Sequence, residues 1–215
     1  HVPFDFSLVS FEGIEEVELE DQKYARELGY SIKHIAHGEL ENNIASVSAY
    51  PTLVNNETLL SQVDKEMNAL EIFSEGVGST VYIGPGAGSE PTASAVIADL
   101  VDIAKGGWEL DINSESSNKL EVSDVQKAAR YYRLQVKDEP GVIAKISSVF
   151  GEKDISIDAL IQHEARSKED LDSVPVVIIS GEITDNEAVK LKNILEELPE
   201  VFPGVKKFRN HSGRS

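Results

Sequence analysis

The chain has 215 residues, contains no cysteine and carries a formal net charge of −18 at pH 7. The lack of cysteine excludes disulfides, thiolate metal ligands and a cysteine nucleophile, and so acidic a surface argues against nucleic-acid and membrane partners. Apolar residues make up 40% of the chain, but no apolar run approaches the ~18–20 residues that a membrane-spanning helix needs. We therefore expect a cytoplasmic globular protein of one large or two small domains.

The first half of the chain has the mixed pattern of an α/β domain. Asp21 is expected to cap a short helix that ends at Gly29. Two strands are predicted at 31–37 and 44–54. Pro51 within the second of them indicates a sheet edge or a strand end, because proline has no N–H to donate to a strand ladder.

A hairpin and a long amphipathic helix follow. The predicted hairpin strands are 68–73 and 79–83, and a glycine-rich turn leads from them into a helix over 91–104. The apolar residues of this helix share one wide face: Ala93, Val96, Ile97, Leu100, Val101 and Ala104. A linker is predicted at 107–129 because the regular pattern stops at two glycines and a polar stretch begins. Within this linker, a short helix is compatible with Val122, Val125, Ala128 and Ala129.

The second half, residues 130–210, has the predicted order β-α-β-β-α-β. The first three elements are a strand at 131–137 that is buried on one face, a helix from Val142 with an acidic N-cap and Gly151 as C-cap, and an alternating strand Ile155–Ile161. A fully buried strand at 174–179 follows. The last two elements are a helix that begins at Thr184 and Glu187 and ends at Pro199, and a strand at 201–208. Two right-handed βαβ units place both helices on one face of a four-stranded antiparallel sheet, the ferredoxin-like arrangement. We expect the other face or an edge of so small a sheet to be covered by a partner, most simply a second copy. Residues 211–215 are read as a tail.

The glycine-rich turn Gly84-Pro85-Gly86-Ala87-Gly88 is the most prominent candidate site. Glycines allow a ligand to approach the backbone, and N–H groups at the start of a helix attract anions. The spacing is not the dinucleotide fingerprint, which requires glycine at Ser89, and no Gly-Lys-Ser/Thr of a P-loop follows. From the spacing alone, two interpretations stay open: contact with a ligand, and a tight turn that packs a helix on a sheet.

Other polar groups do not predict a site. His34 and His37 are three apart in a predicted strand, so their side chains point to opposite faces and no metal site is expected. No G-x-S-x-G nucleophile elbow occurs in the sequence. The acidic residues at the first helix are interpreted as a solvated helix start: Glu18, Glu20 and Asp21.

The segment from Gly84 to Leu100 reads Gly-Pro-Gly-Ala-Gly-x-x-Pro-Thr-Ala-Ser-Ala-Val-x-Ala-Asp-Leu. It closely resembles homoserine dehydrogenases, where the chain returns from the substrate domain to the nucleotide-binding domain, and the likeness covers about residues 4–106. That family interconverts L-aspartate 4-semialdehyde and L-homoserine with NAD(P), in threonine and methionine biosynthesis. The resemblance implies that the backbone of the turn contacts the nicotinamide end of the cofactor through Gly84, Gly86, Ala87 and Gly88.

The segment Asp138-Glu139-Pro140-Gly141-Val142-Ile143-Ala144 resembles the junction between the first strand and the first helix of ACT domains. Many bacterial homoserine dehydrogenases carry such a domain, in which paired copies bind a free amino acid near this junction. The resemblance implies a homodimer or higher homo-oligomer formed through the ACT domain, with threonine, the end product of the pathway, as effector. The implied effector site consists of Asp138, Pro140, Gly141, Val142 and Ile143.

The resemblance also implies parts that these residues do not contain. The nucleotide fingerprint and the acidic block with the catalytic lysine have no counterpart here and are expected upstream of His1, so no catalytic residue is assigned. We therefore expect a C-terminal fragment that is inactive alone, holds no NAD(P) by itself, and serves pairing and sensing. Its expected fold class is α/β (α+β), with a mixed-sheet partial catalytic domain (1–106), the linker and a ferredoxin-like ACT domain.

Two alternative interpretations of function remain. The chain could be a stand-alone ACT-type amino-acid-binding regulatory protein without an enzymatic parent. It could also be a dimerisation module whose amino-acid pocket is vestigial.

Overall fold

The computed structural model describes residues 9–41, 44–107, 121–122, 127–162 and 173–211. The chain divides into two compact units. The hairpin–helix unit comprises Asn56–Lys119, and the sheet unit comprises Phe4–Asn55 together with Leu120–Ser215. Each unit is described by itself below. In the described ranges, no helix has both the length and the apolarity to cross a membrane.

The hairpin–helix unit confirms the predicted hairpin and helix. Its elements are the short 3-10 helix η2 (Leu60–Gln62), the strands β4 (Met67–Ser74) and β5 (Gly78–Pro85), and the helix α2 (Ser89–Ala104). The two strands pair antiparallel over their whole length, from Met67 opposite Pro85 to Ser74 opposite Gly78. No residue of α2 is buried, so its predicted apolar face is exposed.

The sheet unit begins with β1 (Ser10–Phe11), α1 (Leu19–Glu27), β2 (Tyr30–Glu41) and β3 (Ile44–Asn55). The strands β2 and β3 form a long antiparallel pair over 12 residues each. Helix α1 starts two residues before Asp21, with Glu18 as its N-cap. Asp21 is the third helical residue, and its carboxylate accepts the backbone N–H of Glu18 at 2.9 Å. The predicted helix is present, but the capping role of Asp21 is that of a capping box and not of an N-cap.

The second part of the sheet unit has the predicted ferredoxin-like order. Its elements are β7 (Ala128–Lys137), α3 (Val142–Glu152), β8 (Ile157–Gln162), β9 (Ser173–Ile183), α4 (Asp185–Glu196) and β10 (Lys206–His211). The strands pair antiparallel in the order β10-β7-β9-β8. Buried residues from α3 and α4 lie in one core with Tyr132, Leu134 and Val136 of β7, which confirms that both helices cover one face.

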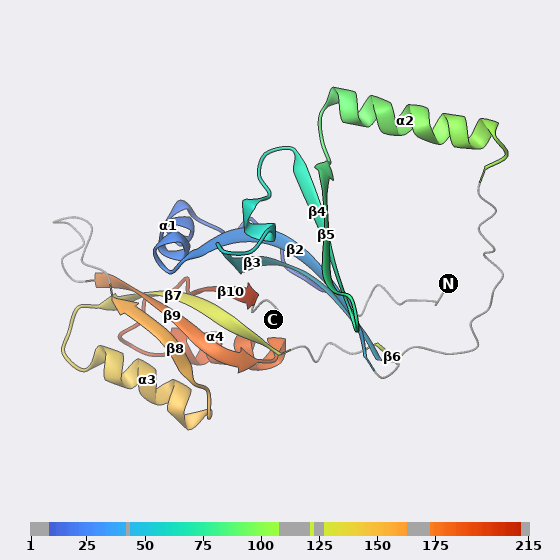
Figure 1. The fold of residues 1–215 in the computed structure, drawn as a ribbon. Helices are drawn as coiled ribbons and strands as arrows, with labels where there is room; N and C mark the ends of the chain where they lie inside the picture. Colours follow the sequence, from blue (N-terminus) through green and yellow to red (C-terminus); the bar gives the residue numbers. More distant parts are fainter. Residues whose placement is uncertain (1–8, 42–43, 108–120, 123–126, 163–172, 212–215) are drawn as a thin grey trace. The chain divides into compact units, whose positions relative to one another are not determined.

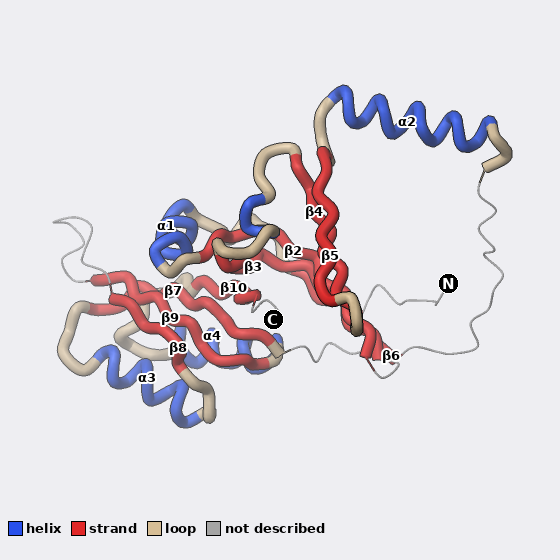
Figure 2. The backbone as a smooth tube through the Cα atoms, in the orientation of Figure 1, coloured by secondary structure: helices blue, strands red, loops and turns tan. Residues whose placement is uncertain are grey.

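The two parts of the sheet unit share a single sheet, which the sequence did not indicate. Strand β10 pairs in parallel with β3, so that the sheet runs β1-β3-β10-β7-β9-β8 (Figures 1 and 2). The opposite face of β7 contributes Tyr131 to a second core with Tyr24 and Ala25 of α1 and Leu53 of β3. The first half of β7 is therefore buried on both faces, and the expectation of an outward face is wrong at Tyr131; the predicted alternation holds further along, where Arg133, Gln135 and Lys137 are partly exposed. The second face and the β10 edge are covered by this chain itself.

Pro51 does not mark a strand end or a sheet edge. It lies inside β3, opposite His34 of β2. On the other side of β3, Ala49 is the last residue paired with β1, and Thr52 is the first paired with β10. The missing N–H therefore coincides with the position where one neighbouring strand replaces another, which is why proline is tolerated there.

Three predicted boundaries are corrected by the structure. The N-cap of α3 is Gly141 and not an acidic residue, and Gly151 lies within this helix, which ends at Glu152. In the predicted linker, Glu121–Val122 forms the short strand β6, paired in parallel with β3, and Ala128 begins β7. The helix suggested there is thus absent at these positions, and Val125 lies outside the described residues.

An irregularity in β8 changes which residues face the helices. The register of β8 against β9 shifts between Ile157 and Ala159. Ile157 and Leu160 consequently pack against the helical core, whereas Ala159 packs against the second core. The strict alternation predicted from Ile155 to Ile161 fails because a bulge reverses the side of every following residue.

Candidate functional site

The glycine-rich turn uses two of its own N–H groups to close the hairpin. The N–H groups of Gly86 and Ala87 both donate to the backbone oxygen of Glu66, at 2.7 and 3.3 Å. A Cβ on Gly86 would lie 1.8 Å from the amide nitrogen of Asn68. A side chain at position 86 would therefore require the Asn68 side chain to move, and these two N–H groups point to Glu66.

The ends of the same turn are open. A Cβ added to Gly84 would have no atom within 4 Å. Gly88 has φ +109°, a region that favours glycine, and it is the N-cap of α2. The first N–H groups of α2 have no partner one turn earlier in the helix. Of the four predicted cofactor contacts, Gly84 and Gly88 are thus the positions where a ligand can approach the backbone.

The predicted effector site lies at the exposed junction of β7 and α3. Gly141 has φ +92° and is the N-cap of α3, and a Cβ there would meet no atom within 4 Å. Asp138 and Pro140 are exposed, whereas Val142 is buried in the helical core and Ile143 packs partly against it. The backbone around Gly141 is therefore accessible, and its neighbours on the helix anchor it.

One turn into the same helix, Lys145 is part of a charged pair. Lys145 forms an ion pair with Glu200, and the N–H of Lys145 donates to the Gly141 oxygen at 3.1 Å. The hydrogen bond from Lys145 lowers the pKa of the Glu200 carboxyl. The backbone oxygen of Glu200 accepts the backbone N–H of Lys137 at 2.9 Å. This pair ties the start of α3 to the segment that precedes β10.

We expect opposite effects from adding a methyl group at two glycines of α3. Gly141→Ala should lower the free energy of unfolding by about 1 kcal/mol, because alanine is strained at positive φ. Gly151→Ala should raise it by about 0.5–1 kcal/mol, because Gly151 is helical and has open space around it. Urea unfolding measures both. Equal changes of the same sign would contradict the left-handed conformation of Gly141.

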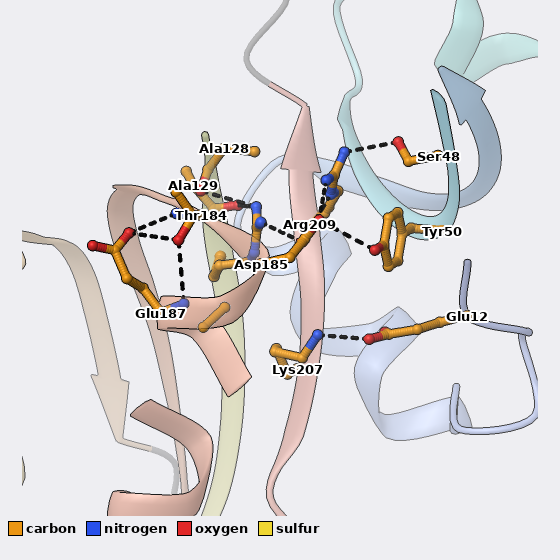
Figure 3. Close-up of polar contacts among 12 residues, drawn as sticks. Glu12, Ser48, Tyr50, Ala128, Ala129, Thr184, Asp185, Glu187, Lys207 and Arg209 are labelled. Carbon is orange, nitrogen blue, oxygen red and sulfur yellow. Dashed lines mark hydrogen bonds and ion pairs between the residues drawn. The ribbon is translucent and has the colours of Figure 1, made fainter. Parts of the chain in front are cut away.

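A buried ionic cluster, which sequence reasoning missed, joins β3, β7, β10 and α4 (Figure 3). The carboxylate of Asp185 accepts hydrogen bonds from two guanidinium groups, Arg130 at 2.7 Å and Arg209 at 2.5 Å. Arg209 also donates to the Ser48 hydroxyl at 3.0 Å, and its guanidinium lies 4.3 Å from the ring centre of Tyr50. We call these five residues the Asp185 cluster. It holds two cations on one carboxylate.

Burial governs the electrostatics of the Asp185 cluster. The side chain of Arg130 is fully buried, and this burial lowers its pKa, while the charge of Asp185 opposes the shift. Burial, with the Asp185 charge next, raises the pKa of Tyr50 to about 12. The Tyr50 hydroxyl therefore keeps its proton at neutral pH and donates it to Asp185 at 3.2 Å.

A second polar cluster surrounds Asp21, which is fully buried. Its carboxylate accepts the Arg133 Nε–H at 2.6 Å and the Tyr131 hydroxyl at 3.0 Å. Arg133 also pairs with Glu18 at 2.8 Å, and Lys206 pairs with Glu18 at 3.1 Å. The interpretation of these residues as a solvated helix start is therefore wrong for Asp21, whereas Glu18 is exposed as expected but forms ion pairs. The partners lie more than 100 residues away, where local sequence gives no signal.

The ion pairs of Glu18 predict that the folded chain becomes less stable in acid. The hydrogen bond from Lys206, followed by that from Arg133, lowers the pKa of Glu18 below its ordinary value of 4.5. A lowered pKa in the folded state contributes stability above pH 4.5 that is lost as the pH falls further. Because Glu18 is partly exposed, Glu18→Gln should cost at most about 1 kcal/mol at pH 6. The difference from the unsubstituted chain should shrink by pH 3, and urea unfolding at both values measures it.

The control for this titration is Glu15→Gln, on the same segment and exposed. It should leave the pH dependence of unfolding unchanged. A Glu18→Gln variant with the same pH profile as the control would contradict the ion pairs.

The histidines predicted to be unsuitable for a metal lie in β2. His34 is within 3.1 Å of the backbone oxygen of Glu12 through its Nε2. Among the residues that the structure describes, no group of three or more His, Asp or Glu side chains is placed to hold a metal ion.

Two family models match the chain. The homoserine dehydrogenase model matches residues 1–101, and the ACT domain model matches residues 133–197. Residues 1–101 belong to the homoserine dehydrogenase family, and residues 133–197 form an ACT domain. The homoserine dehydrogenase segment thus includes α1, β2 and β3, and the strands β2 and β3 share a sheet with the ACT domain.

Curated relatives extend over both segments. The chain is 38% identical to the homoserine dehydrogenase of Helicobacter pylori over 192 residues, 88% of this chain and 44% of the relative. It is 32% identical to that of Pseudomonas aeruginosa over 213 residues, 91% of this chain and 48% of the relative. The chain therefore spans about half the length of the curated relatives that it matches.

Solved structures agree with this assignment. A homoserine dehydrogenase from Thiobacillus denitrificans superposes with a TM-score of 0.80 at 31% identity, covering 98% of this chain and 49% of the other. The homoserine dehydrogenase of Staphylococcus aureus gives a TM-score of 0.60 at 26% identity with the same coverage. The fold of the chain is the mixed α/β fold found in these enzymes.

Proposed function

We propose that this chain forms part of an NAD(P)-dependent homoserine dehydrogenase, which interconverts L-aspartate 4-semialdehyde and L-homoserine. One observation carries the proposal: both segments match homoserine dehydrogenases in the same order along the chain. The match to the Thiobacillus denitrificans structure covers 98% of this chain. The expected division is 1–106 for the catalytic part, 107–129 for the linker and 130–210 for the ACT domain. The stand-alone regulatory protein is not favoured, because residues 1–101 match the enzyme family.

The cofactor proposal concerns the glycine-rich turn only. NAD(P) supplies the hydride acceptor or donor when bound. Gly84 has open space, and Gly88 presents the start of α2, so these two positions fit a backbone contact to the nicotinamide end. Gly86 and Ala87 would support the turn through their bonds to Glu66. We expect the 215 residues alone to hold no NAD(P).

The regulatory proposal places an amino-acid effector, threonine, at the β7–α3 junction. The accessible left-handed Gly141 at the helix start supports it, because N–H groups there suit a carboxylate. We also propose that two copies pair through the ACT domain. Strand β8 supports pairing, since it has β9 as its one neighbour in the described sheet, and a free edge readily adds another strand.

The enzymatic proposal is tested with a chimera. This chain replaces the matching region of the Pseudomonas aeruginosa relative, and NADPH oxidation with aspartate semialdehyde is measured. We expect turnover by the chimera and none by the 215-residue chain alone. A folded chimera that binds NADPH without turnover would contradict the proposal. Turnover by the chain alone would place the catalytic groups within these residues.

The regulatory proposal is tested by calorimetry of this chain with L-threonine. We expect heat of binding, and we expect Gly141→Leu to abolish it because a large side chain blocks the junction. Gly151→Leu is the matched control, since it adds the same side chain to the same helix at an open position. Absence of heat at millimolar threonine would favour the vestigial pocket, and equal binding by both variants would move the site elsewhere.

A further inference from the structure

We call Ser10–Asn55, the part of the homoserine dehydrogenase match that lies in the sheet unit, the enzyme-family segment. Its contact with the ACT domain is buried, like the interior of a single domain. Contacts between domains are usually polar surfaces that allow relative motion. Here β3 extends the ACT sheet by pairing Thr52, Leu53 and Val54 with β10. Leu53 has no exposed surface and lies in the second core with Val177 and Phe208 of the ACT strands.

Polar groups reinforce this contact at two positions along β7. Near its start, the Asp185 cluster joins Ser48 and Tyr50 of β3 to Arg209 of β10. Further along β7, Arg133 binds the fully buried Asp21 of α1. A buried ion pair is costly to break when one partner stays behind without its counter-charge. Separation of the two segments would leave Asp21 and Arg133 without their counter-charge, and it would remove the contacts of Ser48 and Tyr50 with Arg209 and Asp185.

The contacts named above are made by residues outside the connecting chain, of which the short strand β6 also pairs with β3. The two segments are joined along the chain through residues 56–127, which contain the whole hairpin–helix unit. The hydrogen bonds of Arg133 to Asp21 and of Arg209 to Ser48 instead join residues 112 and 161 positions apart. We expect contacts this extensive to hold the segments together when the chain between them is cut.

We infer that Ser10–Asn55 and the ACT domain form one cooperative unit, and that a change in the ACT domain reaches the enzyme-family segment through β3 and not through the connecting chain. We call the β3–β10 pairing with the Asp185 cluster the strand joint. The second half of the inference rests on the proposed sensing role. It means that effector binding acts by stiffening or straining a shared sheet, because the joint does not allow the domain to swing.

The first experiment needs no effector. A protease site is inserted between Asn113 and Ser114 of the full chain, and the protein is cleaved while folded. We expect the two pieces to co-elute in gel filtration and to unfold in one transition detected by circular dichroism. Separation of the pieces, or two transitions from the sheet unit, would overturn the inference.

The second experiment compares amide hydrogen exchange in Arg209→Ala with that in the exposed control Arg26→Ala. Loss of Arg209 should speed exchange of the slowest amides by at least about tenfold, by the same factor in β3 and in β9, because both open in one event. The control should leave both rates unchanged. Acceleration confined to β3 and β10 would show local fraying and refute a single cooperative unit.

The third experiment adds L-threonine to the unsubstituted chain and repeats the exchange measurement. Protection of β3 amides together with those of β7 and α3 supports transmission through the joint. Protection limited to β7 and α3 would refute transmission while leaving the sensing role intact. No protection anywhere would refute both the sensing role and the transmission, and the cooperative unit is then judged by the first two experiments.

Discussion

Replacing Asp185 by asparagine is expected to lower the free energy of unfolding by about 3 kcal/mol. The carboxylate of Asp185 pairs with the guanidinium groups of both Arg130 and Arg209. Removal of its charge leaves two largely buried cations facing each other, and breaking a buried pair in this way typically costs about 3–5 kcal/mol. The amide oxygen of asparagine recovers part of the hydrogen bonding. Urea unfolding at pH 7 gives the value.

Two features of the Asp185 experiment distinguish the loss of the buried ion pairs from other effects of the substitution. Asp185 opens α4, and loss of a negative charge at a helix start costs about 0.3–1 kcal/mol by itself. A loss of unfolding free energy above this range is therefore due to the broken ion pairs with the two arginines. Asp158→Asn, at an exposed position of β8, is the control and should stay within about 0.5 kcal/mol. A loss below 1 kcal/mol for Asp185→Asn would mean that the cluster is hydrated in solution.

Leu53→Ala should be similarly destabilising, by about 3 kcal/mol. Leu53 has no exposed surface, and it packs between α1 and the ACT strands in the second core. Truncation removes buried methyl groups and leaves a cavity that the surrounding sheet cannot fill, for which losses of about 2–5 kcal/mol are usual. Thermal or urea unfolding of the chain measures this loss directly.

The matched control for Leu53 is Leu40→Ala on the neighbouring strand β2, where 65% of the leucine is exposed. It should change the free energy of unfolding by less than about 0.5 kcal/mol. Comparable effects at the two positions would show that β3 does not pack against the ACT strands in solution, and would remove the basis of the strand joint.

The shared sheet changes how the ACT domain is expected to work. Deletion of a domain attached by a flexible linker leaves the rest of a protein folded. Here, deletion of the ACT domain would expose Leu53, Val54 and Tyr24, all of which are buried. The domain is therefore expected to be required for the enzyme-family segment to fold, in addition to any response to an amino acid.

Several elements were predictable because their signals are local. The continuous apolar run of β9 indicated a strand buried between two neighbours, and it pairs with both β7 and β8. The capping box of Thr184 and Glu187 placed the start of α4 correctly, and both of its hydrogen bonds are present. The hairpin and α2 were recognised from alternation and helical periodicity. Each of these signals lies within about a dozen residues of sequence.

The candidate sites were predictable only in part. The position of Gly141 at the start of a helix followed from its motif, but its left-handed backbone came from the structure. The turn at Gly84–Gly88 was recognised, whereas the use of two of its N–H groups by Glu66 was not. In both cases sequence indicated where a site could lie, and backbone geometry decided which groups are available.

The sequence by itself determined the two families, the ferredoxin-like order and the position of each helix within a few residues. Only the tertiary structure decided that β3 joins the ACT sheet, that the first half of β7 is buried on both faces and that Asp21 is buried against Arg133. These features depend on pairs separated by more than 100 residues, such as Arg209 with Ser48. Periodicity reports whether a residue faces an interior, but not which distant segment supplies that interior. A charged residue likewise has the same local pattern whether it faces water or a buried partner.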